Sequence, residues 1–252
     1  MRQTRIYVRH PLTPGARVVL PPGPSQHVTL VLRLAGGDAV TLFNGDGRDY
    51  LGRLLDANRT ATTVVCGSCS EEEPLPPLHI HLALGISKGE RMDFATQKAV
   101  ELGVAELTPL YTSRSIVRLT PDRLAKRQSH WEGVIIAACE QSGRRRLPLL
   151  RQAMSLDAWL ADSRAGGILL DHRSTTPLPA LPRPAGGLVL LVGPEGGLTA
   201  SEQTAAKATG FTAARLGPRV LRTETAPLAA IAAIQTLWGD FTGPALPNDD
   251  GR

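Results

Sequence analysis

The sequence predicts a mixed α/β protein in which a small β-barrel domain precedes a larger domain built on a mostly parallel sheet. Two observations predict this fold. Short β-like runs separated by turn residues fill the first part of the chain, and strands alternate with helices after an acidic, proline-rich stretch. At 252 residues the chain is long enough for two domains, each with its own core.

The first domain is expected over residues 1–72. A hairpin turn, NGDGR at 44–48, joins two of its strands, and its residues tolerate positive φ. One short amphipathic helix is predicted over 25–34. The predicted strands are 5–8, 16–20, 38–43, 49–55 and 61–66. Several short strands at close spacing favour a small barrel. The stretch EEEPLPPL then predicts a stiff linker, which we place at residues 73–78.

The second domain is expected over residues 79–242, and residues 243–252 are expected to be a disordered tail. Its predicted strands are 79–86, 104–112, 166–173, 186–193 and 211–217. Its predicted helices are 89–103, 121–143, 155–164 and 223–240. Gly103 marks the end of the first helix. Trp131 and Trp238 lie at helical core spacing, so we interpret them as packing or dimer residues rather than platforms for bases.

Positive charge is concentrated in one segment. Residues 112–151 hold nine basic and three acidic residues, a net charge of +6, whereas the whole chain carries +5. Such a cluster on a near-neutral background favours a nucleic-acid partner over a merely solvated surface. No apolar run is long enough to span a membrane and no secretory signal is evident, so we expect a cytoplasmic protein.

The cysteines allow two interpretations. Cys66 and Cys69 form a C-x-x-C pair with His79 and His81 nearby, which are residue types that bind zinc. Because no second C-x-x-C pair follows, we favour reduced thiols and expect no metal.

Two strand-to-helix turns carry the candidate chemistry. The first, GPEGGLTASE at 193–202, has glycines that let the backbone approach a ligand, and its Thr199 and Glu202 are spaced as a capping box. It matches neither a Walker A loop nor a dinucleotide-binding turn, and Glu195 would repel a diphosphate. The second, LGPRVLRTETAP at 216–227, follows the next strand.

Both turns lie at carboxyl ends of strands, where open α/β sheets bind ligands. Backbone amides, apolar walls and carboxylates suit a ligand with a purine, a ribose and a positive centre. S-adenosylmethionine fits this description better than NAD or ATP, although a turn without any ligand remains an alternative.

Together, LLVGPEGGLTASE and LGPRVLRTETAPLAAIAAIQ resemble the motifs of the SPOUT methyltransferases of the RsmE type, which methylate uridine N3 in 16S ribosomal RNA. Further blocks, KGERMDFATQKAVELG and AACEQSGRRRLP among them, extend the resemblance over most of the chain. The resemblance implies a PUA-like barrel, a trefoil-knotted α/β domain, a homodimer, and the small ribosomal subunit as partner.

The resemblance also implies which residues contact S-adenosylmethionine. They lie in the two turns and at the end of the strand before them. We carry cofactor contact onto Leu170, Gly193, Glu195, Gly196, Gly197, Leu216, Gly217, Val220 and Leu221.

Methyl transfer to N3 needs positioning and removal of a weakly acidic proton. Arg222 is a candidate to polarise a uracil carbonyl or hold a phosphate. Glu224 and Glu195 are both candidate proton acceptors. An equal alternative for Glu224 is a carboxylate that stabilises the N-terminus of the following helix. An equal alternative for Glu195 is a residue that faces the cofactor or fixes its own loop.

Contacts to RNA phosphates are expected from basic residues near the turns and in the charged segment. The candidates are Lys88, Arg91, Lys98, Arg114, Arg144, Arg145 and Arg146. A non-catalytic RNA-binding protein that assists ribosome assembly is the rival hypothesis, and a nucleotide-dependent enzyme is a weaker one. Binding of S-adenosylmethionine would favour the methyltransferase over the non-catalytic RNA-binding protein, and binding of ATP or NAD would support the nucleotide-dependent enzyme.

Overall fold

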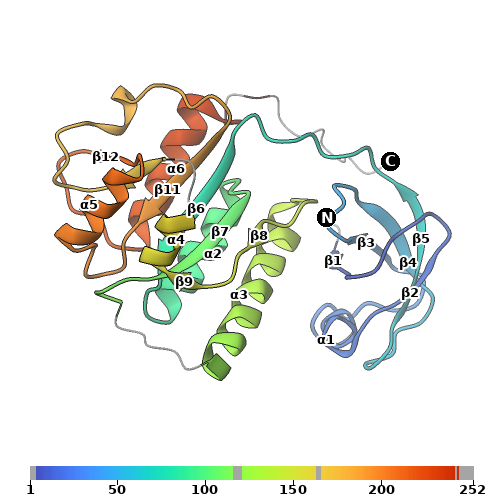
Figure 1. Cartoon of the computed structure of the whole chain (residues 1–252). Coiled ribbons are helices and arrows are strands. Elements are labelled where there is room, and N and C mark those ends of the chain that lie inside the picture. Colours follow the sequence, from blue (N-terminus) through green and yellow to red (C-terminus); the bar gives the residue numbers. More distant parts are fainter. Residues whose placement is uncertain (1–3, 116–120, 163–165, 242, 244–252) are drawn as a thin grey trace. The chain divides into compact units, whose positions relative to one another are not determined.

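A five-stranded, mostly antiparallel sheet forms the first unit of the computed structural model, which describes residues 4–115, 121–162, 166–241 and 243 (Figure 1). The strand order is β1-β3-β4-β5-β2, and only the β1–β3 pair is parallel. The bounds are β1 Arg5–Tyr7, β2 Arg17–Val19, β3 Ala39–Phe43, β4 Tyr50–Leu54 and β5 Thr63–Cys69. Helices α1 (Pro22–Gln26) and η1 (His27–Val31) fill the predicted helical position.

Alternation of side chains explains the core of this unit. In β4, Tyr50, Gly52 and Leu54 are buried while the residues between them are exposed. The buried side chains meet those of Val40 and Leu42 from β3. Residues 136–147, which include the end of helix α3 (Pro121–Ser142), belong to the same compact unit as residues 1–75.

The second unit, residues 76–135 and 148–252, contains a parallel sheet of seven strands. Its order is β12-β10-β11-β6-β7-β8, and β9 also pairs with β7. The strands are β6 His79–Gly85, β7 Glu106–Tyr111, β8 Leu149–Leu150, β9 Met154–Ser155, β10 Ile168–Leu170, β11 Gly187–Val192 and β12 Thr212–Ala214. The helices are α2 Glu90–Glu101, α4 Leu156–Asp162, η2 Leu178–Ala180, α5 Ala200–Ala208 and α6 Thr225–Trp238.

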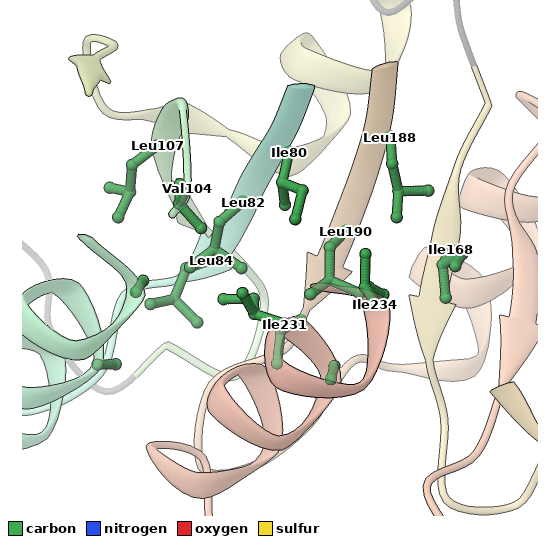
Figure 2. Packing of buried hydrophobic residues seen from close by; sticks show 14 of the residues in the cluster. Ile80, Leu82, Leu84, Val104, Leu107, Ile168, Leu188, Leu190, Ile231 and Ile234 are labelled. Atoms are coloured by element: carbon green, nitrogen blue, oxygen red, sulfur yellow. The ribbon is translucent and has the colours of Figure 1, made fainter. Parts of the chain in front are cut away.

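Side chains of β6 and β11 pack on both faces of this sheet. Ile80, Leu82 and Leu84 join a core that contains Ile231 and Ile234 of α6 (Figure 2). Ala83 and Leu191 instead belong to the opposite core, which includes Trp159 of α4 and Ala206 of α5. The central strands are therefore apolar on both sides, which is why their sequences read as nearly continuous hydrophobic runs.

Several local predictions are confirmed. Gly103 has φ +88° directly after the end of α2, and Trp131 and Trp238 are buried in the α6-side core. Sequence reasoning missed the short strands β8 and β9, because two-residue strands have no periodicity to detect. Apart from Gly243, the predicted tail at 243–252 lies outside the described residues.

None of the helices in the described ranges is long and apolar enough to cross a membrane.

Candidate active site

Three loops that follow β10, β11 and β12 enclose a cavity of about 260 Å³ at the carboxyl edge of the parallel sheet. They are the 170–173, 192–198 and 214–226 segments. Apolar walls come from Leu170, Val192, Leu198 and Leu216. Open parallel sheets place their ligand sites at this edge, because successive loops diverge there.

Glycine geometry shapes the loop after β11. Gly197 has φ +65°, which a residue with a side chain rarely adopts. A Cβ atom on Gly193 would lie 3.0 Å from the Gly197 carbonyl carbon, so a side chain there would push the two ends of the loop apart. A Cβ on Gly85, at the end of β6, would lie 2.5 Å from Pro194, so the neighbouring strand must also end in glycine.

Glu202 links this loop to the loop that follows β7. The predicted capping box is confirmed: Thr199 is the N-cap of α5 and accepts a hydrogen bond from the Glu202 N–H group. The Glu202 carboxylate accepts 2.7 Å hydrogen bonds from the N–H groups of Thr199 and Ser113. Next to Ser113, Arg114 donates to the Gly196 carbonyl at 2.8 Å. Glu202 therefore helps to hold Arg114 against the glycine loop.

The Glu195 carboxylate contacts residues at the start of α2. Its Oε1 accepts from the Lys88 N–H group at 3.0 Å and lies 3.3 Å from Arg91 Nη1. Burial acts to raise the pKa of Glu195. This effect is outweighed by hydrogen bonds from the Lys88 and Glu195 N–H groups, by the charge of Arg91 and by a hydrogen bond from Ser87, so the pKa is lowered. Glu195 is thus held ionised.

Arg91 also reaches the second candidate carboxylate. Its Nε lies 3.9 Å from Glu224 Oε2, so one guanidinium lies between the two acids. Oε2 of Glu195 and Oε2 of Glu224 are both buried and have no hydrogen-bond partner within the described part of the chain. Glu224 is the N-cap residue immediately before α6, and its side chain makes no capping hydrogen bond. Arg222 is exposed on the same loop.

The predicted cofactor residues converge on the cavity. Leu170, Gly193, Glu195, Gly196, Gly197, Leu216, Val220 and Leu221 all line it. Gly217 does not line it, although its φ of +90° sets the turn between Leu216 and the rest of the loop.

The basic residues predicted to contact RNA occupy several environments. Lys98 pairs with Glu101 at 2.7 Å, one turn along α2. Within the first unit, Arg145 lies 3.1 Å from Asp49, and Arg146 pairs with Glu72. The backbone N–H groups of Arg145 and Arg146 both donate to Glu73, and the Arg144 carbonyl accepts from Arg5. The side-chain charges of Arg145 and Arg146 are therefore paired with carboxylates.

The cavity also contains residues that sequence reasoning did not select. Asp171, His172 and Arg173 directly follow β10, and further polar lining comes from Gln203, Arg215, Arg219 and Thr223. The available signal was position: Asp171 to Arg173 follow a buried strand at its carboxyl end, as the two selected loops do.

The two cysteines of the C-x-x-C pair lie in different environments. Cys66 and Cys69 are free thiols, the first buried and the second exposed. No group of three or more His, Cys, Asp or Glu side chains is arranged to hold a metal ion in the residues that the structure describes.

Comparison with known proteins identifies the family. The RNA methyltransferase domain matches residues 74–235, and the RNA methyltransferase PUA domain matches residues 25–65. The chain is 31% identical over 239 residues to ribosomal RNA small subunit methyltransferase E of Buchnera aphidicola subsp. Acyrthosiphon pisum, and 94% of each chain is covered. This chain belongs to the ribosomal RNA small subunit methyltransferase E family.

Solved structures agree with the family and with the fold. Methyltransferase E from Neisseria gonorrhoeae, bound to S-adenosylmethionine, is 40% identical with a TM-score of 0.91, covering 95% of this chain and 100% of the other. A methyltransferase from Legionella pneumophila with the same cofactor is 39% identical, with the same TM-score and coverage. The resemblance predicted from the two loops is confirmed, and with it the PUA-like and SPOUT-type architecture.

Proposed function

We propose that this chain transfers the methyl group of S-adenosylmethionine to N3 of a uridine in the 16S RNA of the small ribosomal subunit. The observation that carries the proposal is the convergence of three loops on one cavity, lined by all but one of the residues expected to contact the cofactor. Relatives that share the architecture were crystallised with S-adenosylmethionine, and the family name specifies small-subunit ribosomal RNA.

The cavity fits the chemistry of this cofactor. Its volume of about 260 Å³ is near the lower end for small-molecule sites. Leu170, Leu198 and Leu216 supply apolar walls for a purine, and glycines bring the backbone close. When bound there, the cofactor supplies an electrophilic methyl group, and the chain's own residues hold the acceptor and manage its proton.

Glu195 is the residue that we assign as proton acceptor. It lines the cavity, is held ionised, and has one buried carboxylate oxygen that accepts no hydrogen bond from any residue the structure describes. Arg91 fixes the orientation of this carboxylate, and Glu224 shares Arg91 from the α6 side. N3 lies on the Watson–Crick edge, so the uridine must be unpaired when it reaches Glu195.

Arg222, exposed on the loop that leads into α6, is assigned to the substrate. Its guanidinium would donate to a uracil carbonyl or to a phosphate. The resemblance further supports a trefoil knot, a homodimer and a cytoplasmic location, and we include these in the proposal.

The test is methyl transfer from tritiated S-adenosylmethionine to small ribosomal subunits that lack the modification, followed by mapping of the product base. We expect label on uridine N3. Calorimetry with S-adenosylmethionine separates a methyltransferase from a non-catalytic RNA-binding protein, which need not bind the cofactor. Label on another base would overturn the assignment of the acceptor atom, and no cofactor binding would overturn the whole proposal.

Two matched substitutions test the role of Glu195. In Glu195→Gln the amide oxygen still accepts from the Lys88 N–H group, so the loop is preserved while the basic oxygen is lost. We expect kcat to fall by about 10²- to 10⁴-fold with cofactor affinity nearly unchanged. Glu224→Gln, also beside Arg91, should have a smaller effect. If Glu195→Gln retains wild-type turnover, Glu195 is not the proton acceptor.

A further inference from the structure

The rim of the cavity carries more positive than negative charge. Arg114, Arg173, Arg215 and Arg219 line it, against Asp171 and Glu195. The Glu195 charge is opposed by Arg91 at 3.3 Å, and one oxygen of Asp171 accepts from the Arg173 N–H group at 3.0 Å. The site therefore presents a surplus of guanidinium groups.

Two of these four arginines have internal partners. Arg114 donates to the Gly196 carbonyl at 2.8 Å, and Arg215 donates to the Thr175 carbonyl at 3.3 Å. Arg173 and Arg219 are exposed, and their side chains make no hydrogen bond or ion pair within the described ranges of the chain. They come from different loops, the one after β10 and the one after β12.

Other predicted RNA contacts differ in this respect. Arg91, Lys98, Arg145 and Arg146 each pair with a carboxylate. An arginine that already has a carboxylate partner gains less from a phosphate, because the new contact replaces an existing one. The side chains of Arg173 and Arg219 pair with no carboxylate among the described residues, so a phosphate would displace none.

The chemistry that suits this rim is a phosphodiester. A nucleotide that enters the cavity brings a phosphate on each side of its ribose, whereas S-adenosylmethionine has one carboxylate and no phosphate. Arginine pairs with phosphate through two parallel N–H donors. We propose that Arg173 and Arg219 bind the RNA phosphates that flank the target nucleotide. This inference rests on the proposed function, because it takes the ligand at the cavity mouth to be RNA.

The test compares two double variants of the full chain. Arg173→Ala/Arg219→Ala removes the proposed contacts. Arg183→Ala/Lys207→Ala removes the same charge from exposed residues that neither line the cavity nor lie in the basic segment 112–151. Binding to a transcript of small-subunit ribosomal RNA is measured across about 50 to 200 mM salt. Binding of S-adenosylmethionine is measured in parallel by calorimetry.

We expect the slope of log affinity against log salt to fall by roughly 1.4 in Arg173→Ala/Arg219→Ala, because each lost single-strand phosphate contact removes about 0.7. The control should keep the wild-type slope, and Arg173→Lys/Arg219→Lys should retain most of it. Cofactor affinity should change less than about twofold in every variant, well under the tenfold that 1.4 kcal/mol represents.

Two outcomes overturn the inference. If both alanine double variants change the slope equally, Arg173 and Arg219 act only through net charge. If Arg173→Ala/Arg219→Ala weakens S-adenosylmethionine binding and leaves the slope intact, the arginines bind the cofactor carboxylate instead. Failure of the proposed function would be a separate result, because the wild-type chain would then transfer no methyl group. The salt dependence of RNA binding could still be compared between the variants in that case.

Discussion

Glu202→Gln tests whether the carboxylate that joins the β7 and β11 loops also maintains the cavity. Glu202 is 6% exposed and accepts from the N–H groups of Ser113 and Thr199, both at 2.7 Å, and from the Thr199 hydroxyl at 3.0 Å. A glutamine has one accepting oxygen, so its NH₂ group must face one of the two N–H donors. An unsatisfied buried donor costs about 1–3 kcal/mol.

A loss of about 2 kcal/mol corresponds to a fall in Tm of roughly 4–8 °C for a chain of this size. Thermal unfolding measures it, and calorimetry measures S-adenosylmethionine binding, which should also weaken because Arg114 and Gly196 line the cavity. Glu90→Gln is the control, since Glu90 is exposed in the first turn of α2. If Glu202→Gln unfolds and binds as the control does, the linking role is refuted. A lower Tm with unchanged cofactor binding would limit that role to stability.

The same variant has a pH signature. Burial acts to raise the pKa of Glu202, but hydrogen bonds from the Ser113 and Thr199 N–H groups and from their hydroxyls outweigh it, so the folded-state pKa is lowered. A lowered folded pKa contributes stability above the unfolded value of about 4.3, and this contribution is lost as the pH falls through the folded value. The stability difference between wild type and Glu202→Gln should therefore be full at neutral pH and shrink below about pH 4.

Three further predictions follow from single contacts. Gly85→Ala places a Cβ 2.5 Å from Pro194, so cofactor affinity measured by calorimetry should fall about tenfold or more. The control is Gly133→Ala, because a Cβ at Gly133 on α3 meets open space; this variant should raise Tm slightly. Arg145→Ala removes the pairing with Asp49 and the hydrogen bond to the Glu71 carbonyl. The free energy of unfolding of the first unit, measured by denaturant titration, should fall by about 1–3 kcal/mol. The fall should be smaller at high salt, because salt screens the ion pair in the wild type. Because the pKa of Glu195 is lowered, the pH–rate profile of methyl transfer should show no ionisation of this carboxylate between about pH 5 and 8, and only a loss of rate below its ordinary value of about 4.3.

Sequence reasoning succeeded where structure depends on near neighbours. The capping box of Thr199 and Glu202 spans three residues, and the positive φ of Gly103 is a property of one residue. Both are set by local geometry, so the pattern alone predicts them. The alternation of strands and helices likewise predicts a parallel sheet, although it does not give the strand order β12-β10-β11-β6-β7-β8.

Pairing between distant residues was not predictable. Arg145 and Asp49 are 96 residues apart, and Arg91 and Glu195 are 104 apart. A count of charges in one segment cannot tell a guanidinium that has a carboxylate partner from one that faces solvent. For the same reason the sequence drew attention to Arg144, Arg145 and Arg146, whereas the structure leaves Arg173 and Arg219 exposed beside the cavity.

Glu195 shows how a sound prediction can rest on incomplete electrostatics. In the sequence, a carboxylate within a glycine-rich loop favours a ligand with a positive centre over a diphosphate. In the structure, Arg91 opposes that charge and the rim of the cavity carries four arginines against two acids. The charge of Glu195 therefore does not select the cofactor by itself. What distinguishes the site is the pair of glycine-containing loops after β11 and β12, the strands on either side of β10, which bring backbone and apolar walls together around one cavity that Glu195 also lines.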